Sequence, residues 1–490
     1  MRRLIVGPFN RVEGDLEVRL DIADGAVRAA YVNSPLYRGF EQILQGKAPL
    51  DALVFVPRIC GICSVAQSSA AAQALAAAMG LTPAANGRVA ANLVLACENL
   101  ADHVTHFYLF FMPDFARPVY AGRPWHATAA GRFQAVAGSA AAAMLPARAA
   151  FLGLMGLLAG KWPHTLALQP GGSARAVQAA EKIRLLVLLR EFRVWLEKHL
   201  FGDTLENIAA LDSRAALEAW MAARPGQGGE KGISDFRLFL EIAHDLDLEQ
   251  LGRAGDAFLS YGNFPQADDD GGRLFPAGVW TGSLAPFDET LIAEDVTRSW
   301  LAGENASLHP SQGATLPLPD KPDAYTWCKA PRLGGRVVET GALARQLVAG
   351  QPLLRALAAQ HGGNVLSRVV ARMLEVARLL PEMERWLRQL TPGEPFCFEG
   401  KLPEEGAGHG LVEAARGSLG HWLQIRRGRI HSYQIIAPTT WNFSPRDAAG
   451  TPGALEQALV GAPVGEGEDT PVTVQHIVRS FDPCMVCTVH

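Results

Sequence analysis

The sequence reads RICGIC at Arg58–Cys63 and DPCMVCTVH at Asp482–His490, close to the two ends of the chain. Each stretch contains a Cys-x-x-Cys pair, a spacing that lets two thiolates reach one metal ion from a single turn of the backbone. Two such pairs provide four soft sulfur ligands, which suit zinc, nickel or an iron–sulfur cluster. Almost the whole chain separates the pairs, so a shared metal site requires a fold that brings the two ends together.

The spacing alone leaves three interpretations of these cysteines open. The first is a structural zinc ion with four cysteine ligands, although the pairs of such sites usually lie a few tens of residues apart. The second is another kind of redox or metal site, and the third is that the cysteines are unrelated. Cys97, Cys328 and Cys397 form no pair, and we interpret them as core residues or inert thiols, so they provide no second ligand set for an iron–sulfur cluster.

The composition is that of a globular protein and excludes several function classes. Hydrophobic residues make up 49% of the 490 residues and charged residues 19%, with a net charge of −4, so we expect a large core. No basic block indicates binding to nucleic acid. The odd number of cysteines, seven, argues against a disulfide framework. The apolar run after Arg3 is shorter than the roughly 7–15 residues of a secretory signal. We therefore expect a cytoplasmic protein unless a partner carries an export signal.

The hydrophobic pattern predicts a mainly α, α+β fold with small β elements near both termini. We expect one domain over residues 1–490, with a β-rich start at about 1–35. A helical body follows at about 60–400 and begins with an Ala-rich helix. The segment at about 410–490 contains a hairpin and the second cysteine pair, and the β elements at both ends bring the termini together.

Three local patterns refine this prediction. Alternating residues around Asp24-Gly25 and around Gly428 indicate strand–turn–strand hairpins. Residues 135–160 are rich in alanine and glycine, but a proline and an arginine interrupt the run, and a membrane span needs roughly 20 strongly apolar residues. We therefore predict a buried helix pair there and no direct membrane span.

Further motifs, in the same order along the chain, resemble those of the nickel–iron hydrogenase large subunit. They are Arg11-Val12-Glu13-Gly14, Arg38-Gly39-Phe40-Glu41, Asp102 with His106-Phe107-Tyr108, Arg416-Gly417 to Gly420-His421-Trp422, and Pro438-Thr439-Thr440-Trp441-Asn442 with Ser444-Pro445-Arg446-Asp447. A respiratory complex I subunit shares this fold but lacks the four metal cysteines, which excludes it. The resemblance implies a helical body around a buried bimetallic site.

The resemblance assigns the four paired cysteines to nickel. Cys60 and Cys484 would bind nickel terminally, while Cys63 and Cys487 would bridge it to iron. The iron would carry one carbon monoxide and two cyanides, Fe(CN)2(CO), installed by maturation proteins. Molecular hydrogen would split heterolytically, and Cys484 would pass the proton to Glu13, because a carboxyl near charge can relay protons. Without the resemblance, Glu13 is an ordinary surface carboxylate.

The resemblance also assigns residues around the metals. Arg416 would lie above them with its guanidinium toward the cyanides, since a planar and always charged donor suits anionic ligands. Asp102 would pair with Arg416, and Asp482 would help to fix it. Pro438 and Thr439 would lie next to the metal ligands. An ordinary salt bridge is the alternative interpretation of the Asp102 pair.

A structural magnesium ion is the third assignment. Glu41, His490 and the backbone carbonyl of Ile435 would bind it, and oxygen ligands suit this hard cation. The alternative interpretation of His490 is a frayed terminus.

The sequence departs from the standard enzymes at several positions. Gln67 stands where they have a histidine, and Ile62 and Phe110 stand where they have valine and leucine in the gas channel. No residues follow His490, where standard precursors carry a removable extension; either the protein lacks this extension by design or the sequence is that of the mature form. Together these four features resemble those of the hydrogen-sensing regulatory hydrogenases, in which a narrower gas channel admits hydrogen and hinders oxygen. Neutral drift is the alternative interpretation of each feature.

The resemblance implies partners as well. We expect a small subunit that carries the iron–sulfur clusters, a dimer of heterodimers and a histidine kinase that receives the hydrogen signal. A respiratory uptake hydrogenase is the alternative function within the family. A non-catalytic structural zinc protein is the alternative outside it.

Overall fold

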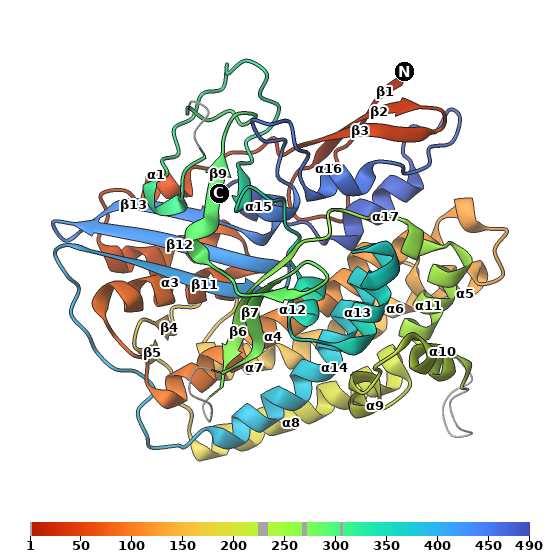
Figure 1. The fold of residues 1–490 in the computed structure, drawn as a ribbon. Coiled ribbons are helices and arrows are strands. Elements are labelled where there is room, and N and C mark those ends of the chain that lie inside the picture. Colours follow the sequence, from red (N-terminus) through yellow and green to blue (C-terminus); the bar gives the residue numbers. More distant parts are fainter. Residues whose placement is uncertain (1, 224–233, 267–271, 304–306) are drawn as a thin grey trace.

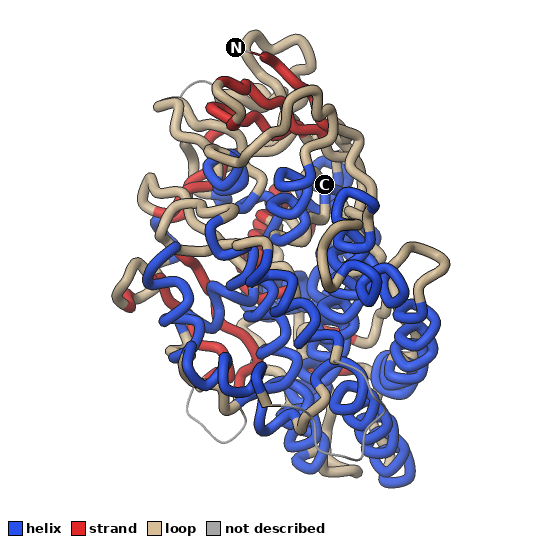
Figure 2. Tube along the Cα trace, turned by 90° about the vertical axis from the view of Figure 1, so that its right-hand side faces the viewer, coloured by secondary structure: helices blue, strands red, loops and turns tan. Residues whose placement is uncertain are grey.

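Helices dominate the computed structural model, which describes residues 2–223, 234–266, 272–303 and 307–490. The N-terminal strands lie at one end of the molecule, other strands run through its middle, and long helices fill the opposite end (Figure 1, Figure 2). The helices are α1 (Phe40–Leu44), α2 (Ala52–Phe55), α3 (Ser64–Met79), α4 (Ala85–Thr105), α5 (His126–Phe133), α6 (Ser139–Phe151), α7 (Gly153–Ala159), α8 (Ala179–Trp195), α9 (Leu205–Ala209), α10 (Arg214–Ala222), α11 (Asp235–Asp245), α12 (Ala342–Val348), α13 (Pro352–His361), α14 (Val365–Gln389), α15 (Pro438–Asn442), α16 (Ala454–Leu459), α17 (Val472–Ser480) and α18 (Met485–Thr488). The predicted α+β fold class is confirmed.

The strands within the described residues form small antiparallel sheets. The sheet near the N-terminus has the order β1-β2-β3, and the one near the C-terminus has the order β11-β12-β13. A third sheet, β6-β7-β8, and the ribbons β4-β5 and β10-β9 lie within the helical body. Their bounds are β1 (Arg2–Val6), β2 (Glu17–Ala23), β3 (Ala26–Asn33), β4 (Leu168–Gln169), β5 (Gly172–Ser173), β6 (Phe258–Pro265), β7 (Arg273–Trp280), β8 (Leu284–Ala285), β9 (Ile292–Asp295), β10 (Ala330–Leu333), β11 (Gly406–Ala414), β12 (Gly417–Arg426) and β13 (Arg429–Ile436).

Both predicted hairpins are present and use the same turn chemistry. Asp24 and Gly25 join β2 to β3 with φ angles of 54° and 70°, and Arg427 and Gly428 join β12 to β13 with φ angles of 52° and 66°. Two successive residues with positive φ make the tight turn whose twist matches that of paired strands. The glycine in each turn adopts this conformation at no steric cost.

Helix α3 packs directly on β11, and small residues on both elements allow this close approach. Gly408 and Gly410 of β11 face α3, where an added Cβ would lie 2.2 Å from the carbonyl oxygen of Ala74 and 1.9 Å from that of Ala70. Glycine has no side chain and alanine only a methyl group, so nothing larger than a methyl group separates the helix from the strand at these positions. The Ala-rich composition of α3 therefore serves this contact as well as helix formation, and the contact fixes the helix that follows the first cysteine pair.

The two ends of the chain are joined, as the sequence predicts. The backbone N–H of Val27 donates to the carbonyl oxygen of Ala462 at 3.0 Å, and β3 lies beside α16 (Figure 1). Farther in, Glu13 and Cys484 form a parallel β-bridge. These contacts place the second cysteine pair against the N-terminal segment.

The segment predicted as a buried helix pair forms two helices that are only partly buried. Ser139–Ala159 is the one stretch of the described residues long and apolar enough to span a membrane, with mean hydropathy 1.6 and 28% of its most apolar window buried. It consists of two helices, α6 and α7, that meet at Leu152. Helix α6 lies against α8 and buries Ala140, Met144 and Phe151 on that side. Helix α7 buries four of its seven residues, as predicted. The predicted burial is wrong for α6, because small alanine side chains make a sequence apolar without requiring burial.

The contact between α3 and β11 generates a prediction about stability. Gly410→Ala should destabilise the protein by about 3 kcal/mol, because overpacking against rigid backbone typically costs about 1–3 kcal/mol. The matched control is Gly131→Ala in α5, where an added Cβ meets nothing within 4 Å, and where alanine is the better helix former. The midpoint of thermal unfolding should fall for the first variant and not for the second. Equal midpoints would contradict this account of the packing.

Candidate metal centre

Cys60 and Cys63 lie in the loop that leads into α3, and Cys63 is the residue before the helix. The buried carboxylate of Glu98, from α4, fixes the start of this helix. It accepts hydrogen bonds from the backbone N–H groups of Val65 at 2.8 Å and Ala66 at 2.9 Å. The first turn of a helix has donors without partners inside the helix, and an acidic group satisfies them. Burial raises the pKa of Glu98 to about 8, although these hydrogen bonds lower it.

Cys484 is held by the backbone of the N-terminal segment and by α15. The N–H of Met485 donates to the carbonyl oxygen of Glu13 at 2.7 Å. The N–H of Cys484 itself donates to the hydroxyl oxygen of Thr439 at 3.1 Å. Pro438 begins α15 one residue earlier. The predicted neighbours Pro438 and Thr439 are thus part of the turn that supports the second cysteine pair.

Arg38 joins the two cysteine-bearing segments. Its guanidinium donates to the carbonyl oxygen of Ile59 at 2.6 Å and also to the carbonyl oxygen of Val486. Ile59 precedes Cys60, and Val486 precedes Cys487. One side chain therefore bonds to both loops that carry the sulfur atoms.

The structure brings the four paired cysteines into one buried cluster. Their sulfur atoms all lie within 4.8 Å of one another, and the cluster is the one group among the described residues with at least three potential His, Cys or acidic metal ligands. The sulfur–sulfur distances are 3.5 Å for Cys60–Cys484, 3.1 Å for Cys63–Cys487 and 3.1 Å for Cys484–Cys487. Both pairs therefore reach one site.

This cluster has the chemistry of a metal site. Burial raises the pKa of the thiols of Cys484 and Cys487, because a buried charge is costly unless it is compensated. Thiolates this close together also repel one another. Metal cations between the sulfur atoms remove both costs, and thiolate ligands suit nickel and iron.

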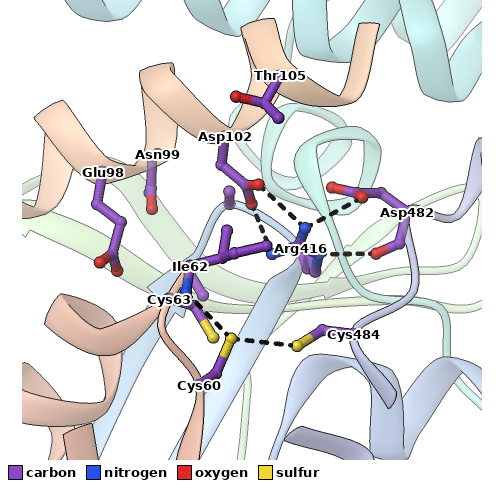
Figure 3. Close-up of polar contacts among 12 residues, drawn as sticks. Cys60, Ile62, Cys63, Glu98, Asn99, Asp102, Thr105, Arg416, Asp482 and Cys484 are labelled. Atoms are coloured by element: carbon purple, nitrogen blue, oxygen red, sulfur yellow. Dashed lines mark hydrogen bonds and ion pairs between the residues drawn. The ribbon is translucent and has the colours of Figure 1, made fainter. Parts of the chain in front are cut away.

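Arg416 lies above the sulfur atoms and is fixed by two aspartates, with Ile62 at its side (Figure 3). It forms an ion pair with Asp102 at 2.7 Å and one with Asp482 at 3.2 Å. Its Nε–H also donates to the backbone oxygen of Asp482 at 2.9 Å. Burial raises the pKa of Asp102 to about 7, although Arg416 lowers it. The predicted trio of Arg416, Asp102 and Asp482 is therefore assembled next to the cluster.

Glu13 is half-buried beside the second cysteine pair. Burial raises its pKa above the usual value, and the nearby Cys60 raises it further, while Arg416 and Arg38 lower it. A carboxyl with a raised pKa next to a cluster of thiols can accept and release a proton. Glu13 is therefore not an ordinary surface carboxylate, because it is half-buried and lies beside the cysteine cluster.

Two of the three substituted positions, Gln67 and Ile62, lie beside the cysteines. Gln67 is buried on α3, and its amide nitrogen lies 3.8 Å from the sulfur of Cys487. Ile62 is in the first cysteine loop, where its N–H donates to the sulfur of Cys60 at 3.3 Å. Phe110 belongs to the π-helical turn His106–Phe111 after α4. Such turns are frequent at functional sites.

Glu41 and His490 meet in a second buried polar cluster. The Nε2 atom of His490 lies 3.2 Å from a carboxylate oxygen of Glu41, and the same oxygen accepts a hydrogen bond from the N–H of Ile435 at 2.8 Å. His490 is 6% exposed, so it is not frayed. Ile435 contacts Glu41 through its N–H, whereas the resemblance implies that its carbonyl is a magnesium ligand.

Sequence reasoning missed the partner of this acid, Lys329. Its ammonium lies 3.3 Å from Glu41 and 3.3 Å from Glu294. Burial raises the pKa of Glu41, but Lys329 and His490 more than offset this and bring it to about 2. Sequence reasoning also missed Glu98. The spacing could have indicated it, because an acid four residues before Asp102 lies on the same face of the helix.

Comparison with known proteins places this site in a family. The chain matches the family model described as nickel-dependent hydrogenase over residues 38–142 and 234–490. It is 31% identical to the periplasmic NiFeSe hydrogenase large subunit of Desulfomicrobium baculatum, over 100% of this chain and 95% of that protein. It is 28% identical to the hydrogenase-2 large chain of Escherichia coli (strain K12), over 100% of this chain and 97% of that one.

Solved structures agree with the sequence matches. The Ni-Fe-Se hydrogenase from D. vulgaris Hildenborough in the reduced state has a TM-score of 0.83 to this chain and 30% sequence identity, with 100% of both chains covered. Fold and site thus define a metalloprotein whose two ends share one thiolate-bound centre. The chain belongs to the nickel-dependent hydrogenase family as a large subunit, with four cysteines positioned for a nickel–iron site.

The position of Arg38 predicts how firmly the metal is held. Arg38→Gln removes hydrogen bonds from a charged donor, which are worth about 1.5–3 kcal/mol each. The matured protein should therefore lose nickel to a chelator at least roughly tenfold faster, since about 1.4 kcal/mol corresponds to tenfold. The control is Arg28→Gln, which removes an exposed ion pair with Asp24 far from the site. Equal rates of nickel release would show that Arg38 does not hold the loops together.

Proposed function

We propose that this chain is the hydrogen-activating subunit of a slow, oxygen-tolerant hydrogen sensor that controls hydrogenase gene expression. The observation that carries the proposal is the surroundings of the thiol cluster. Gln67 takes the place of a histidine beside Cys487, and the bulkier Ile62 takes the place of valine beside Cys60. Both changes stand next to the metal ligands, where they affect the reaction and access to it.

In this proposal the cofactors are those that the resemblance implies. The four cysteines would hold the nickel–iron group, with Cys63 and Cys487 as the shared ligands that the resemblance implies, and the iron would carry one carbon monoxide and two cyanides installed by maturation proteins. The fixed positive charge of Arg416 beside the cluster supports anionic ligands on the iron. Glu41 and His490 would hold magnesium, since they supply a carboxylate and an imidazole 3.2 Å apart.

The reaction follows from the groups around the centre. A nickel–iron group held by the four cysteines would supply an electrophilic centre for the heterolytic splitting of molecular hydrogen. The thiolate of Cys484 accepts the proton, and Glu13, bonded to the same segment through the N–H of Met485, takes it next. Arg416 holds a fixed positive charge over the site, because Asp102 and Asp482 anchor both of its sides.

Electrons leave the site through a partner chain in this proposal. Cys97, Cys328 and Cys397 lie outside the four-thiol group, which supports the view that iron–sulfur clusters belong to a small subunit. This chain and the small subunit form a heterodimer in this proposal, and two heterodimers associate in the cytoplasm. A histidine kinase receives the hydrogen signal.

Oxygen access tests the sensor function directly. The double variant Ile62→Val with Phe110→Leu should lose hydrogen-oxidation activity faster under air than the unmodified protein, because smaller side chains widen the route for oxygen. The control carries the same two chemical changes on the surface, Ile5→Val with Phe398→Leu, at exposed positions. Half-times of inactivation under air are the measurement. If the double variant is as stable as the control, the narrow-channel account is wrong.

The proton route predicts a separate effect. Glu13→Gln should slow hydrogen–deuterium exchange into hydrogen gas by roughly 10²–10⁴-fold, the usual contribution of a positioned acid or base. Nickel content should stay unchanged, since Glu13 contacts the second cysteine segment through its backbone. Asp15→Asn is the control, because Asp15 is an exposed acid two positions away. Unchanged exchange in the Glu13 variant would place the proton route elsewhere.

A further inference from the structure

Gln67 is part of a buried chain of polar side chains that ends at a cysteine sulfur. Its amide oxygen lies 2.8 Å from Nε2 of His421, on β12. The other ring nitrogen of His421, Nδ1, lies 2.8 Å from the hydroxyl of Tyr433, on β13. The amide nitrogen of Gln67 lies 3.8 Å from the sulfur of Cys487. A continuous series of hydrogen bonds thus runs through the core from Tyr433 through His421 and Gln67 to Cys487.

The chemistry of the sulfur determines which group donates and which accepts in each hydrogen bond of this series. A metal-bound thiolate carries no hydrogen and can only accept hydrogen bonds, so the NH2 end of the Gln67 amide must face Cys487. The amide oxygen then faces His421 and can only accept, which requires a hydrogen on Nε2 of that ring. Burial lowers the pKa of His421 to about 3, so the ring is neutral and has one N–H. Its Nδ1 therefore accepts a hydrogen bond from the hydroxyl of Tyr433.

The alternative orientation of the amide is unfavourable. If the Gln67 amide turned over, its oxygen would face the thiolate, and two acceptors would meet in a buried site. The N–H of His421 excludes this orientation, because it needs an acceptor at the position of the amide oxygen. Without that N–H, the long contact with the thiolate, at 3.8 Å, is left as the interaction that selects the orientation of the amide.

We propose that His421, itself oriented by Tyr433, is a positioning residue that holds the Gln67 amide as a donor to Cys487. The inference rests on the proposed function, in which Cys487 bridges nickel to an iron with carbon monoxide and cyanide ligands. Hydrogen bonds to a ligating sulfur tune the electronic properties of a metal site. The Gln67 donor withdraws electron density from the bridging thiolate, and its loss leaves the iron richer in electrons.

The infrared spectrum of the matured protein measures this effect apart from activity. An iron richer in electrons donates more to carbon monoxide, so His421→Leu and Gln67→Leu should both move the carbon monoxide band to lower wavenumber. The double variant should show about the same shift as Gln67→Leu, because coupled residues are not additive. Additive shifts would contradict the inference, since His421 would then act independently of Gln67.

Two milder variants guard against a loss of folding. Tyr433→Phe keeps the ring and should shift the band in the same direction by less. His421→Gln keeps a side-chain donor and should bring the band back toward its position in the unmodified protein. Tyr325→Phe is the control, because it removes another tyrosine hydrogen bond, to Glu456 at 2.7 Å, and should leave the band in place.

The outcomes separate the inference from the proposed function. If the unmodified protein shows one carbon monoxide and two cyanide bands that none of these variants moves, the role of His421 is refuted and the proposed centre stands. If the unmodified, folded and matured protein shows no such bands, the proposed centre itself is refuted, and the inference with it.

Discussion

The site depends on the pairing of the two ends of the chain. The N–H of Met485 donates a hydrogen bond to the carbonyl oxygen of Glu13 at 2.7 Å. The C-terminal segment must lie against the N-terminal one, or the second pair of cysteines cannot reach the first. The two segments are held together by backbone pairing, by the hydroxyl of Thr439 and by the guanidinium of Arg38. They hold four groups together that would otherwise repel one another once deprotonated. Metal ions and the closed chain therefore stabilise each other, since binding to the folded state alone favours that state.

The first cysteine pair depends on helix packing in the same way. Helix α3 begins directly after Cys63, and its place is fixed along its length by the glycines of β11. Glu98 fixes its first turn through the backbone. Because the helix cannot shift, Gln67 keeps its position near Cys487, and β12 brings His421 to the same point. The fold thus sets the ligand geometry and also the polar groups that surround the sulfur atoms.

Sequence reasoning succeeded where a local pattern has one structural meaning. Asp24-Gly25 and Gly428 predicted hairpin turns, and the two cysteine pairs with their accompanying motifs predicted a shared site. It failed where the outcome depends on distant partners. The exposure of α6 depends on which helices cover it, and alanine gives no signal for that. The ammonium of Lys329 pairs with Glu41 from a distant part of the chain, and no spacing in the sequence announces such a contact.

X-ray absorption at the nickel edge tests the central claim most directly, namely that the four cysteines from both chain ends hold nickel. For the matured protein we predict a first shell of sulfur atoms at a distance near the roughly 2.3 Å of zinc–thiolate bonds, with iron as a heavier neighbour beyond it. Nickel surrounded by nitrogen and oxygen, or zinc in place of nickel in folded and matured protein, would contradict the account.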